Sequence, residues 1–395
     1  MVVMRNRSKA VELHERFNGK LSIESKIDIQ TEQDLSLVYT PGVAEICQEI
    51  EAYPERVNTL TSRGQTVAVI TDGTAVLGLG DIGPKAAMPV MEGKCILFKK
   101  FADLNAFPIC LDEKDPEAII SIVKALAPTF AGINLEDISA PRCFEIERRL
   151  KEELDIPVFH DDQHGTAIVV LAGLYNALRL TQRNPKDTKI VINGAGAAGI
   201  SIARLLLDAG FEHITLVSLE GVVCKGASWL NEAQKEIAER TNKNLLQGTL
   251  DDVISDKDVF IGVSGPNALR PLQVKRMAKR AIVFALANPV PEIYPNDALK
   301  AGAEVVATGR SDFPNQVNNV LAFPGIFRGA IEANATNITI PMKLAAARAI
   351  ADLISEEELH ADYIIPRSLN QQVSYAVAAA VEQIAKEGAE NDAQS

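Results

Sequence analysis

The sequence predicts an α/β protein made of an N-terminal α/β domain and a Rossmann-like, doubly wound dinucleotide-binding domain. Short apolar runs typical of buried parallel strands alternate with longer stretches whose apolar residues recur at helical spacing. One apolar run, 189–193, leads directly into a glycine loop at 194–199. With 395 residues the chain is long enough for two domains with large cores. We place the first domain at residues 1–160 and the second at 161–395.

The composition excludes several classes of partner. The net charge is −12 and 5% of the residues are aromatic, so neither a basic surface nor a base-stacking platform for nucleic acid is expected. No apolar run approaches the roughly 20 residues of a membrane span, and the N-terminus lacks the apolar core of a secretory signal. The five cysteines are scattered without a C-x-x-C pair, which is typical of free thiols in a reducing compartment. We therefore expect a cytoplasmic protein that binds neither nucleic acid nor membrane.

The first domain begins with residues 1–60, whose helical periodicity is interrupted at Tyr39-Thr-Pro-Gly42 by a proline and a glycine that favour a turn. Residue chemistry alone predicts a structural role for Tyr39. A strand at 66–70 then leads into a glycine-rich loop, 71–83, whose backbone a small ligand could approach closely.

Lys94 lies between a helical stretch, 86–93, and an apolar run, 95–98, that we interpret as a strand. A lysine in this position is usually the solvated end of an element. The alternative is a partly buried amine with a lowered pKa, which suits proton transfer. A strand at 107–111 and a helix at 115–126 continue the alternation.

Two acidic pairs each follow an apolar run. Glu136-Asp137 comes after the run that starts at Gly132, and Asp161-Asp162 comes after the strand-like residues that end at Phe159. Acidic pairs at the ends of neighbouring strands would crowd like charges. A bound divalent cation relieves this repulsion, and carboxylate oxygens suit Mg²⁺ or Mn²⁺.

Two alternatives to this metal site remain open. His160 and His164 have the i, i+4 spacing of a zinc pair, although no cysteine or further histidine lies nearby in sequence to complete the shell. The acids could instead cap helices or pair with Arg142 and Arg148. A long apolar helix is expected to follow the acidic cluster, from Ala167 to about residue 180.

The glycine loop has the G-x-G-x-x-G spacing, between a strand and a helix, that dinucleotide binding requires. Gly194 permits a tight turn, Gly196 permits close approach of a pyrophosphate, and Gly199 lets helix and strand pack closely. The phosphates would lie against free N–H groups at the positive end of the helix. The predicted cofactor contacts are Gly194, Ala195, Gly196, Ala197, Ala198 and Gly199.

The second strand of this unit, 214–217, ends at Ser218, where such proteins usually carry an acid that binds a ribose. The nearest acid, Glu220, is two residues late. Asn288, Asn318 and Asn319 follow later strands, at the edge of the sheet where ligands gather. The remaining expected elements are strands at 259–263, 281–287 and 304–307, helices at 227–240, 249–254, 342–353 and 369–385, and a polar tail from Glu387 that frays.

Taken in order, these motifs resemble those of the malic enzymes, in particular the short bacterial form, from about residue 10 to 385. Eight motifs in the family's order make a chance match negligible. The resemblance replaces the structural interpretations of Tyr39 and Lys94 with catalytic ones. The motifs are Tyr39-Thr-Pro-Gly42, Thr71–Gly80, Met91-Glu-Gly-Lys94, Asn134-Leu-Glu136-Asp137, Phe159–Thr166, the glycine loop, Ala287-Asn288-Pro289 and Asn318–Gly325.

The resemblance implies roles for individual residues. Lys94 is expected to be the general base, Tyr39 the general acid, and Asp161 the hydrogen-bond partner of Lys94. Asn288 and Asn319 are expected to hold the substrate near the nicotinamide, and Asn288 also contacts the cofactor. The family further implies a homodimer or a larger assembly. The expected ligands of Mg²⁺ or Mn²⁺ are Glu136, Asp137 and Asp162.

The implied reaction is the oxidative decarboxylation of (S)-malate to pyruvate and CO₂ with NAD(P)⁺. The metal would chelate the substrate and lower the pKa of its hydroxyl group, and Lys94 would accept that proton while hydride leaves for the nicotinamide. The metal would also stabilise the enolate formed when CO₂ leaves, and Tyr39 would protonate it. The charge of the metal, together with burial, is expected to favour the neutral amine of Lys94.

The sequence departs from the family pattern in two places. Residues 98–109 lack the arginine that clamps a substrate carboxylate in the larger malic enzymes, and we expect Thr74 to help replace it. Ser218 stands where most NAD-using relatives have an aspartate. Serine removes a charge that would repel the 2′-phosphate of NADP, but Leu219 adds no cation, and only Lys225 is close in sequence. We therefore expect NAD as cofactor, with NADP permitted, and Ser218 as part of the site.

Ser218 also keeps a different enzyme class open. A soluble, metal-dependent oxaloacetate decarboxylase with a weakened nucleotide site would need the metal ligands, Lys94 and Tyr39, but no hydride transfer. The intact glycine loop favours the malic enzyme instead. A nucleotide-sensing regulatory protein is the weakest reading, because it would need neither Lys94 nor the carboxylates.

Overall fold

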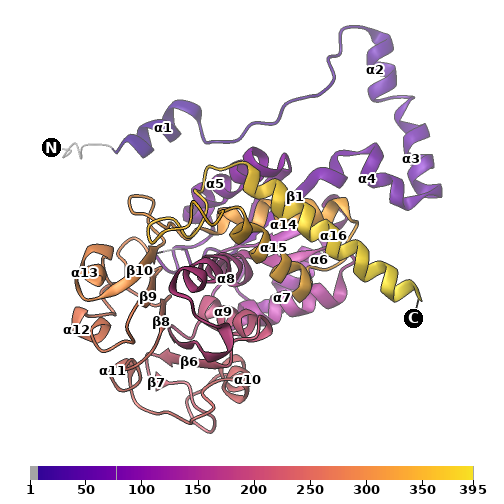
Figure 1. Cartoon of the computed structure of the whole chain (residues 1–395). Coiled ribbons are helices and arrows are strands. Elements are labelled where there is room, and N and C mark those ends of the chain that lie inside the picture. The colour runs from indigo at the N-terminus through magenta and orange to yellow at the C-terminus, as the bar shows by residue number, and fades with distance from the viewer. Residues whose placement is uncertain (1–7, 77, 395) are drawn as a thin grey trace, which may run out of the picture.

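The computed structural model describes residues 8–76 and 78–394, and it contains two sheets flanked by helices (Figure 1). The first sheet has the order β2-β1-β3-β4 with every pair parallel. Its strands are β1 (Thr66–Thr71), β2 (Asn105–Cys110), β3 (Gly132–Leu135) and β4 (Val158–His160). Its main helices are α5 (Pro84–Ala102), α6 (Pro116–Leu126) and α7 (Arg142–Glu153). The predicted alternation of strands and helices in this region is confirmed.

The second sheet has the order β10-β9-β8-β5-β6-β7. Its five long strands run parallel, and the order reverses beside β5, as in a Rossmann-like sheet. The parallel strands are β5 (Lys189–Asn193), β6 (His213–Ser218), β8 (Val259–Gly262), β9 (Ala281–Ala285) and β10 (Ala303–Thr308). The short β7 (Gly221–Val222), which the sequence did not indicate, pairs antiparallel with the end of β6. The predicted α/β fold class is therefore confirmed.

Helix α8 (Asp161–Thr181) connects the two sheets and lies at the centre of the molecule (Figure 1). Its residues 167–172 are buried without interruption, so the helix packs on every side. It begins six residues earlier than predicted, directly after His160, because acidic residues in the first turn favour a helix N-terminus. The other helices around the second sheet are α9 (Ala197–Asp208), α10 (Glu232–Arg240), α11 (Leu250–Val253), α12 (Pro271–Val274) and α13 (Pro295–Lys300).

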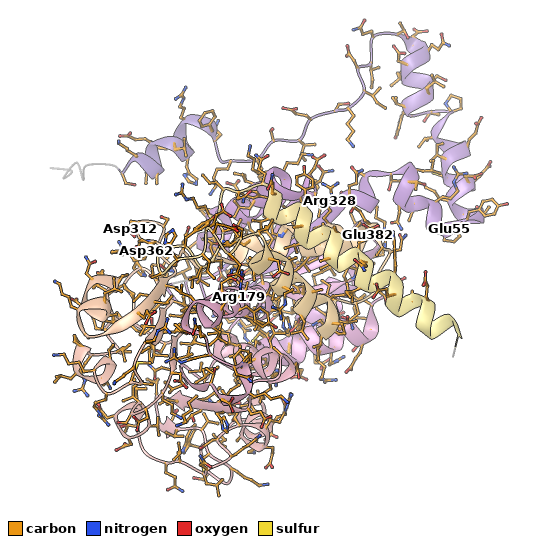
Figure 2. The ribbon with its side chains drawn as sticks, in the orientation of Figure 1. Glu55, Arg179, Asp312, Arg328, Asp362 and Glu382 are labelled. Atoms are coloured by element: carbon orange, nitrogen blue, oxygen red, sulfur yellow. The ribbon has the colours of Figure 1, made fainter. Side chains whose placement is uncertain are left out.

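Of the three C-terminal helices, α14 (Phe323–Glu332) and α16 (Gln372–Gln394) pack against α5 beside the first sheet, and α15 (Ile340–Asp352) packs against α8. Phe323 and Phe327 of α14 pack edge-on against Phe98 of α5, with ring centroids 4.7 and 5.3 Å apart. Arg328 lies beside α16 (Figure 2), with its guanidinium 5.2 Å from the ring centroid of Tyr375. The predicted fraying from Glu387 is wrong, since α16 continues to Gln394.

The predicted strand at 95–98 is also wrong, because α5 continues through it to Ala102. The apolar residues Met91, Cys95, Phe98 and Ala102 are all buried and lie three or four positions apart. A short apolar run cannot by itself distinguish a strand from the buried face of a helix. Lys94 therefore lies inside a 19-residue helix and not at the end of an element.

The N-terminal arm, residues 8–60, projects from the first domain (Figure 1) but contacts α5, where the Lys20 N–H donates to Glu92 Oε2 at 3.1 Å. Its helices are α1 (Lys9–Phe17), α2 (Glu32–Val38), α3 (Val43–Ala52) and α4 (Val57–Leu60), and none of them contains a buried residue. Glu55 (Figure 2) lines a cavity together with Leu104 and Arg328, so this end of the arm lies against the first domain. The predicted break at Tyr39–Gly42 is confirmed, because α2 ends at Val38 and α3 begins at Val43. In the described part of the chain, no helix is long and apolar enough to span a membrane.

Candidate active site and nucleotide site

Three carboxylates converge where β3 and β4 end. Glu136 and Asp137 follow β3, and Asp162 lies in the first turn of α8, directly after β4. Because Leu135 pairs with His160, the two strands end side by side. One oxygen from each carboxylate lies within 4.8 Å of the others. Among residues 8–76 and 78–394, this is the only such group of potential metal ligands, and it contains no histidine.

The electrostatics of these three acids fit a divalent cation. Burial and the neighbouring carboxylates raise the pKa of Asp137 to about 9, and burial raises that of Asp162 to about 6. The Asp137 backbone N–H donates to Asp162 Oδ2 at 2.8 Å, while Asp137 Oδ2 is buried without a hydrogen-bond partner. Such an acceptor is costly unless a ligand or an ion satisfies it. Oxygen donors in this number suit Mg²⁺ or Mn²⁺.

Lys94 projects from α5 into the same cluster. Its Nζ lies 2.5 Å from Asp161 Oδ2 and 2.9 Å from Glu136 Oε1, and it sits 4.2 Å from the ring centroid of Phe323. The side chain is 7% exposed, so the solvated interpretation of Lys94 is wrong. Burial alone would lower the pKa of Lys94, but Asp161 and Glu136 outweigh it and raise that pKa above its ordinary value. The predicted neutral amine is therefore not favoured by the protein groups alone.

Asp161 is held by groups from two further elements. Its Oδ2 accepts a hydrogen bond from Nδ2 of Asn319, which follows β10, as well as from Lys94. Burial raises the pKa of Asp161 to about 7. A side chain at Gly165 would place its Cβ 1.8 Å from Asp161 Oδ1, so only glycine fits beside this carboxylate. The contact between Lys94 and Asp161 is the one that the family resemblance implied.

The glycine-rich loop 71–83 and the turn after β9 meet across the two sheets. A Cβ on Gly78 would lie 2.8 Å from the carbonyl oxygen of Asn288. Gly78 has a φ of +72°, which glycine adopts without strain. The structure thus brings Asn288 against the loop that contains Thr74.

The hydroxyl of Thr74 is already occupied by protein partners. It donates to Asp72 Oδ1 at 2.6 Å and accepts from the Ser139 N–H at 3.0 Å and from Arg142 at 2.5 Å. Arg142 also forms an ion pair with Asp72. The predicted pairing of Arg142 with the acids after β3 is not present, and Arg148 pairs with Glu152 at 2.8 Å instead. Nothing in the sequence indicated that Arg142 would be joined to Thr74.

The two histidines do not form a zinc pair. His164 Nε2 lies 2.9 Å from Glu147 Oε2, and Lys343 Nζ lies 3.0 Å from His164 Nδ1. His160 is fully buried, and burial lowers its pKa. The network of Glu147, His164 and Lys343 joins α7, α8 and α15 behind the carboxylates, and no motif in the sequence revealed it.

Of the three predicted catalytic residues, Tyr39 alone lies on the N-terminal arm and outside the carboxylate cluster. It caps the C-terminus of α2 on the arm, and α2 is clearly separated from α5 and α8 (Figure 1). The side chain is 67% exposed.

The glycine loop has the predicted geometry. Gly194 has a φ of +121°, and a Cβ on Gly199 would lie 1.8 Å from the Gly194 carbonyl oxygen, so both positions require glycine. Gly196 precedes α9, and no atom lies within 4 Å of the position a Cβ would take there. The helix N-terminus behind the loop is thus open to an anionic ligand. Ser218 ends β6, and its Oγ lies 2.5 Å from Glu220 Oε2.

The fold and the glycine loop define a Rossmann-type nucleotide-binding protein with a carboxylate and lysine cluster beside it. Residues 18–151 match the family model described as "Malic enzyme, N-terminal domain". Residues 163–386 match the one described as "Malic enzyme, NAD binding domain". The chain belongs to the malic enzyme family.

Individual relatives are similar over nearly the whole chain. An NAD-dependent malic enzyme from Geobacillus stearothermophilus is 58% identical over 92% of this chain and 76% of its own length. A bifunctional malic/malolactic enzyme from Bacillus subtilis is 56% identical over 96% of this chain and 93% of its own. The crystal structure of an NAD-dependent malic enzyme from Thermotoga maritima superposes with a TM-score of 0.92, at 50% identity, over 95% of this chain and 99% of that one.

Proposed function

We propose that this protein is a malic enzyme, which oxidatively decarboxylates (S)-malate to pyruvate and CO₂ with NAD(P)⁺. The observation that carries the proposal is the placement of Lys94 between Asp161 and Glu136, within the only carboxylate trio of the described residues. The names of the relatives from Geobacillus and Thermotoga support the same activity. We propose residues 1–160 as the catalytic domain and 161–395 as the nucleotide-binding domain, with the boundary where β4 passes into α8.

We propose that Glu136, Asp137 and Asp162 hold Mg²⁺ or Mn²⁺. The buried, unpartnered oxygen of Asp137 and the raised pKa values of Asp137 and Asp162 support this assignment, because a cation would stabilise their ionised forms. When bound, the metal supplies Lewis-acid polarisation of the substrate oxygens.

Lys94 is the general base in this proposal. The charge of a bound cation would favour the neutral amine, whose Nζ would then accept the proton of the C2 hydroxyl group, while Asp161 holds the amine in place through the 2.5 Å contact. Asn319 in turn holds Asp161. Asn288 and Asn319 contact the substrate near the nicotinamide. Since Thr74 is occupied by Asp72, Ser139 and Arg142, we propose that it acts by fixing Arg142 rather than by direct contact.

Tyr39 is the proposed general acid, and its position supports a homodimer. The arm carries apolar side chains without a covering surface, and the carboxylate site of the same chain lacks this tyrosine. In a dimer with symmetrically exchanged arms, each copy would cover the apolar side chains of the other copy's arm and would receive Tyr39 from that arm. We propose that each arm covers the partner and delivers Tyr39 to the partner's site, in a cytoplasmic dimer.

The oxaloacetate decarboxylase alternative is not favoured. It depended on a weakened nucleotide site, but the glycine loop has intact geometry, and the similar proteins named above carry malic enzyme names.

The test uses the purified full chain with Mn²⁺ and compares two reactions. Malate-dependent reduction of NAD⁺ and NADP⁺ is followed by absorbance, and loss of oxaloacetate is followed without nucleotide. We expect malate oxidation with at least one nucleotide. Fast oxaloacetate loss with malate oxidation at background for both nucleotides would contradict the proposal.

A further inference from the structure

The turn that follows β6 brings a carboxylate to Ser218, the position where the usual acid is missing. Gly194 donates its N–H to the Val217 carbonyl oxygen at 2.8 Å, so the end of β6 lies directly beside the glycine loop. Ser218 follows Val217 at this edge, where the adenosine ribose lies in Rossmann-type sites. The Glu220 carboxylate returns to this point, with Oε2 at 2.5 Å from Ser218 Oγ.

The backbone holds Glu220 in this position. Ser218 pairs with Gly221 across a two-residue turn, and Val222 donates its N–H to the Gly248 carbonyl oxygen at 2.8 Å. Gly221 has a φ of +133°, and a Cβ there would lie 2.8 Å from the same carbonyl oxygen, so the turn requires glycine. Leu219, at the tip of the turn, is fully exposed. The turn thus points its apolar residue to solvent and leaves its carboxylate at the end of β6.

The charges at this edge of the sheet favour a ribose over a phosphate. The hydrogen bond from Ser218 lowers the pKa of Glu220, which therefore carries a negative charge at neutral pH. In the segment 218–226 the only basic residue is Lys225, and its Nζ is paired with Glu239 at 2.6 Å. A carboxylate accepts hydrogen bonds from ribose hydroxyls, whereas a 2′-phosphate beside it meets like charge.

We propose that Glu220, positioned by Ser218 and by the β6–β7 turn, binds the adenosine ribose and selects NAD over NADP. This assignment rests on the proposed function, because it requires that the glycine loop binds a dinucleotide. It replaces our expectation that serine at 218 leaves NADP permitted. The negative charge missing at residue 218 is supplied two residues later.

The test measures equilibrium binding of NADH and NADPH by their fluorescence, without malate or metal. We expect the wild-type protein to bind NADH at least 10-fold more tightly than NADPH at low salt. Glu220→Gln keeps the shape but removes the charge, so it should reduce the ratio of the two dissociation constants about 10-fold, mainly by tighter NADPH binding. Higher salt should lower this ratio in the wild type but not in the variant, because ions screen the exposed charge.

Glu212→Gln is the matched control, because Glu212 precedes the same strand at its opposite end and pairs with Lys243 at 3.3 Å. It should leave the ratio unchanged. Equal affinity of the wild type for the two dinucleotides, or an unchanged ratio in Glu220→Gln, would overturn the assignment of Glu220. Binding of neither dinucleotide would instead contradict the proposed function, on which the assignment depends.

Discussion

The carboxylate site and the N-terminal arm differ in how far a single chain completes them. At the site, side chains from α5, α8 and the loop after β3 meet in a buried cluster whose members contact one another. Along the arm, four helices bury nothing, and apolar side chains such as Ile23, Leu37 and Tyr39 face solvent. An exposed apolar surface of this length marks a region that another surface covers. The comparison supports the proposal that the arm of a second copy completes the site, whereas the proposed metal ligands all come from one chain.

The largest effect is expected from a substitution in the buried cluster of Lys94 and the carboxylates. Lys94→Ala should lower malate oxidation by about 1,000-fold or more, since it removes the proposed general base. Lys99→Ala, on the exposed face of the same helix, should leave the rate unchanged, because Lys99 pairs only with groups at the surface. NADH binding, measured alongside, should persist in both variants and shows that they are folded. Substantial malate oxidation by Lys94→Ala would refute the role of the lysine.

A second variant tests whether the carboxylates hold the metal within one chain. Asp162→Asn should weaken Mn²⁺ binding by at least about 100-fold, because it removes a proposed ligand charge. Asp155→Asn, an exposed aspartate shortly before β4, is the control and should leave the affinity unchanged. Free Mn²⁺ can be quantified by electron paramagnetic resonance. Equal Mn²⁺ affinity in the two variants would place the metal elsewhere.

The third experiment distinguishes an arm that acts on its own chain from one that acts on a partner. Tyr39→Phe alone should lower the rate about 100-fold through loss of the general acid. When it is co-expressed with Lys94→Ala, exchanged arms give each mixed dimer one site with both residues intact. Random pairing should then restore about a quarter of wild-type activity.

The same co-expression has a clear contrary outcome. If Tyr39 served its own chain, every site in the mixture would lack one of the two residues, and activity would stay at background. Deleting the arm up to residue 60 should in addition convert the dimer to a monomer in light scattering. Retention of the dimer would show that the arm does not hold the copies together.

The smallest expected effect concerns stability. Burial lowers the pKa of Lys343 to about 7, while its pKa in the unfolded chain has the ordinary value near 10.5. Between these values the unfolded state binds a proton that the folded state does not, so stability rises with pH. Below pH 7 both states are protonated and the full cost of burying the charge remains. The charged and titratable groups that face Lys343 are Lys151 and Glu147 of α7, His164 of α8, and Arg204 and Asp208 of α9.

Lys343→Met removes this titration. From pH 7 to pH 9, the free energy of unfolding of the wild type should gain about 1–2 kcal/mol relative to that of the variant, measured by urea denaturation. His164 does not titrate in this window, since burial lowers its pKa to about 3 in the presence of Lys343. If the difference in free energy of unfolding between the two proteins did not change from pH 7 to pH 9, the amine of Lys343 would not change its charge in this range.

Much of the fold followed from local patterns. The long strands of both sheets, the helix α6 and the glycine loop were predicted within a few residues, because buried parallel strands and helix starts leave strong local signals. The errors lay where local signals were ambiguous. The run at 95–98 was apolar enough for a strand but belonged to the buried face of α5, and β7 was too short to be recognised.

The candidate site followed from the sequence only in part. The residue types of Glu136, Asp137 and Asp162 suggested a metal, but nothing local determined that Asn319, in a segment after β10, would reach Asp161. Likewise, the pairing of Arg142 with Asp72 and Thr74 joins residues about 70 positions apart.

The sequence by itself determined the fold class, the order of the elements and the chemistry available to the site, because these depend on residue type and on spacing within about 20 residues. Only the tertiary structure decided which charges meet. It paired Lys94 with Asp161 and Glu136, which raises the pKa of the amine instead of lowering it. It turned Glu220 back onto Ser218, and it left Tyr39 outside the site of its own chain. Such contacts depend on how elements far apart in the sequence pack together, and the distances that packing sets cannot be obtained from sequence spacing.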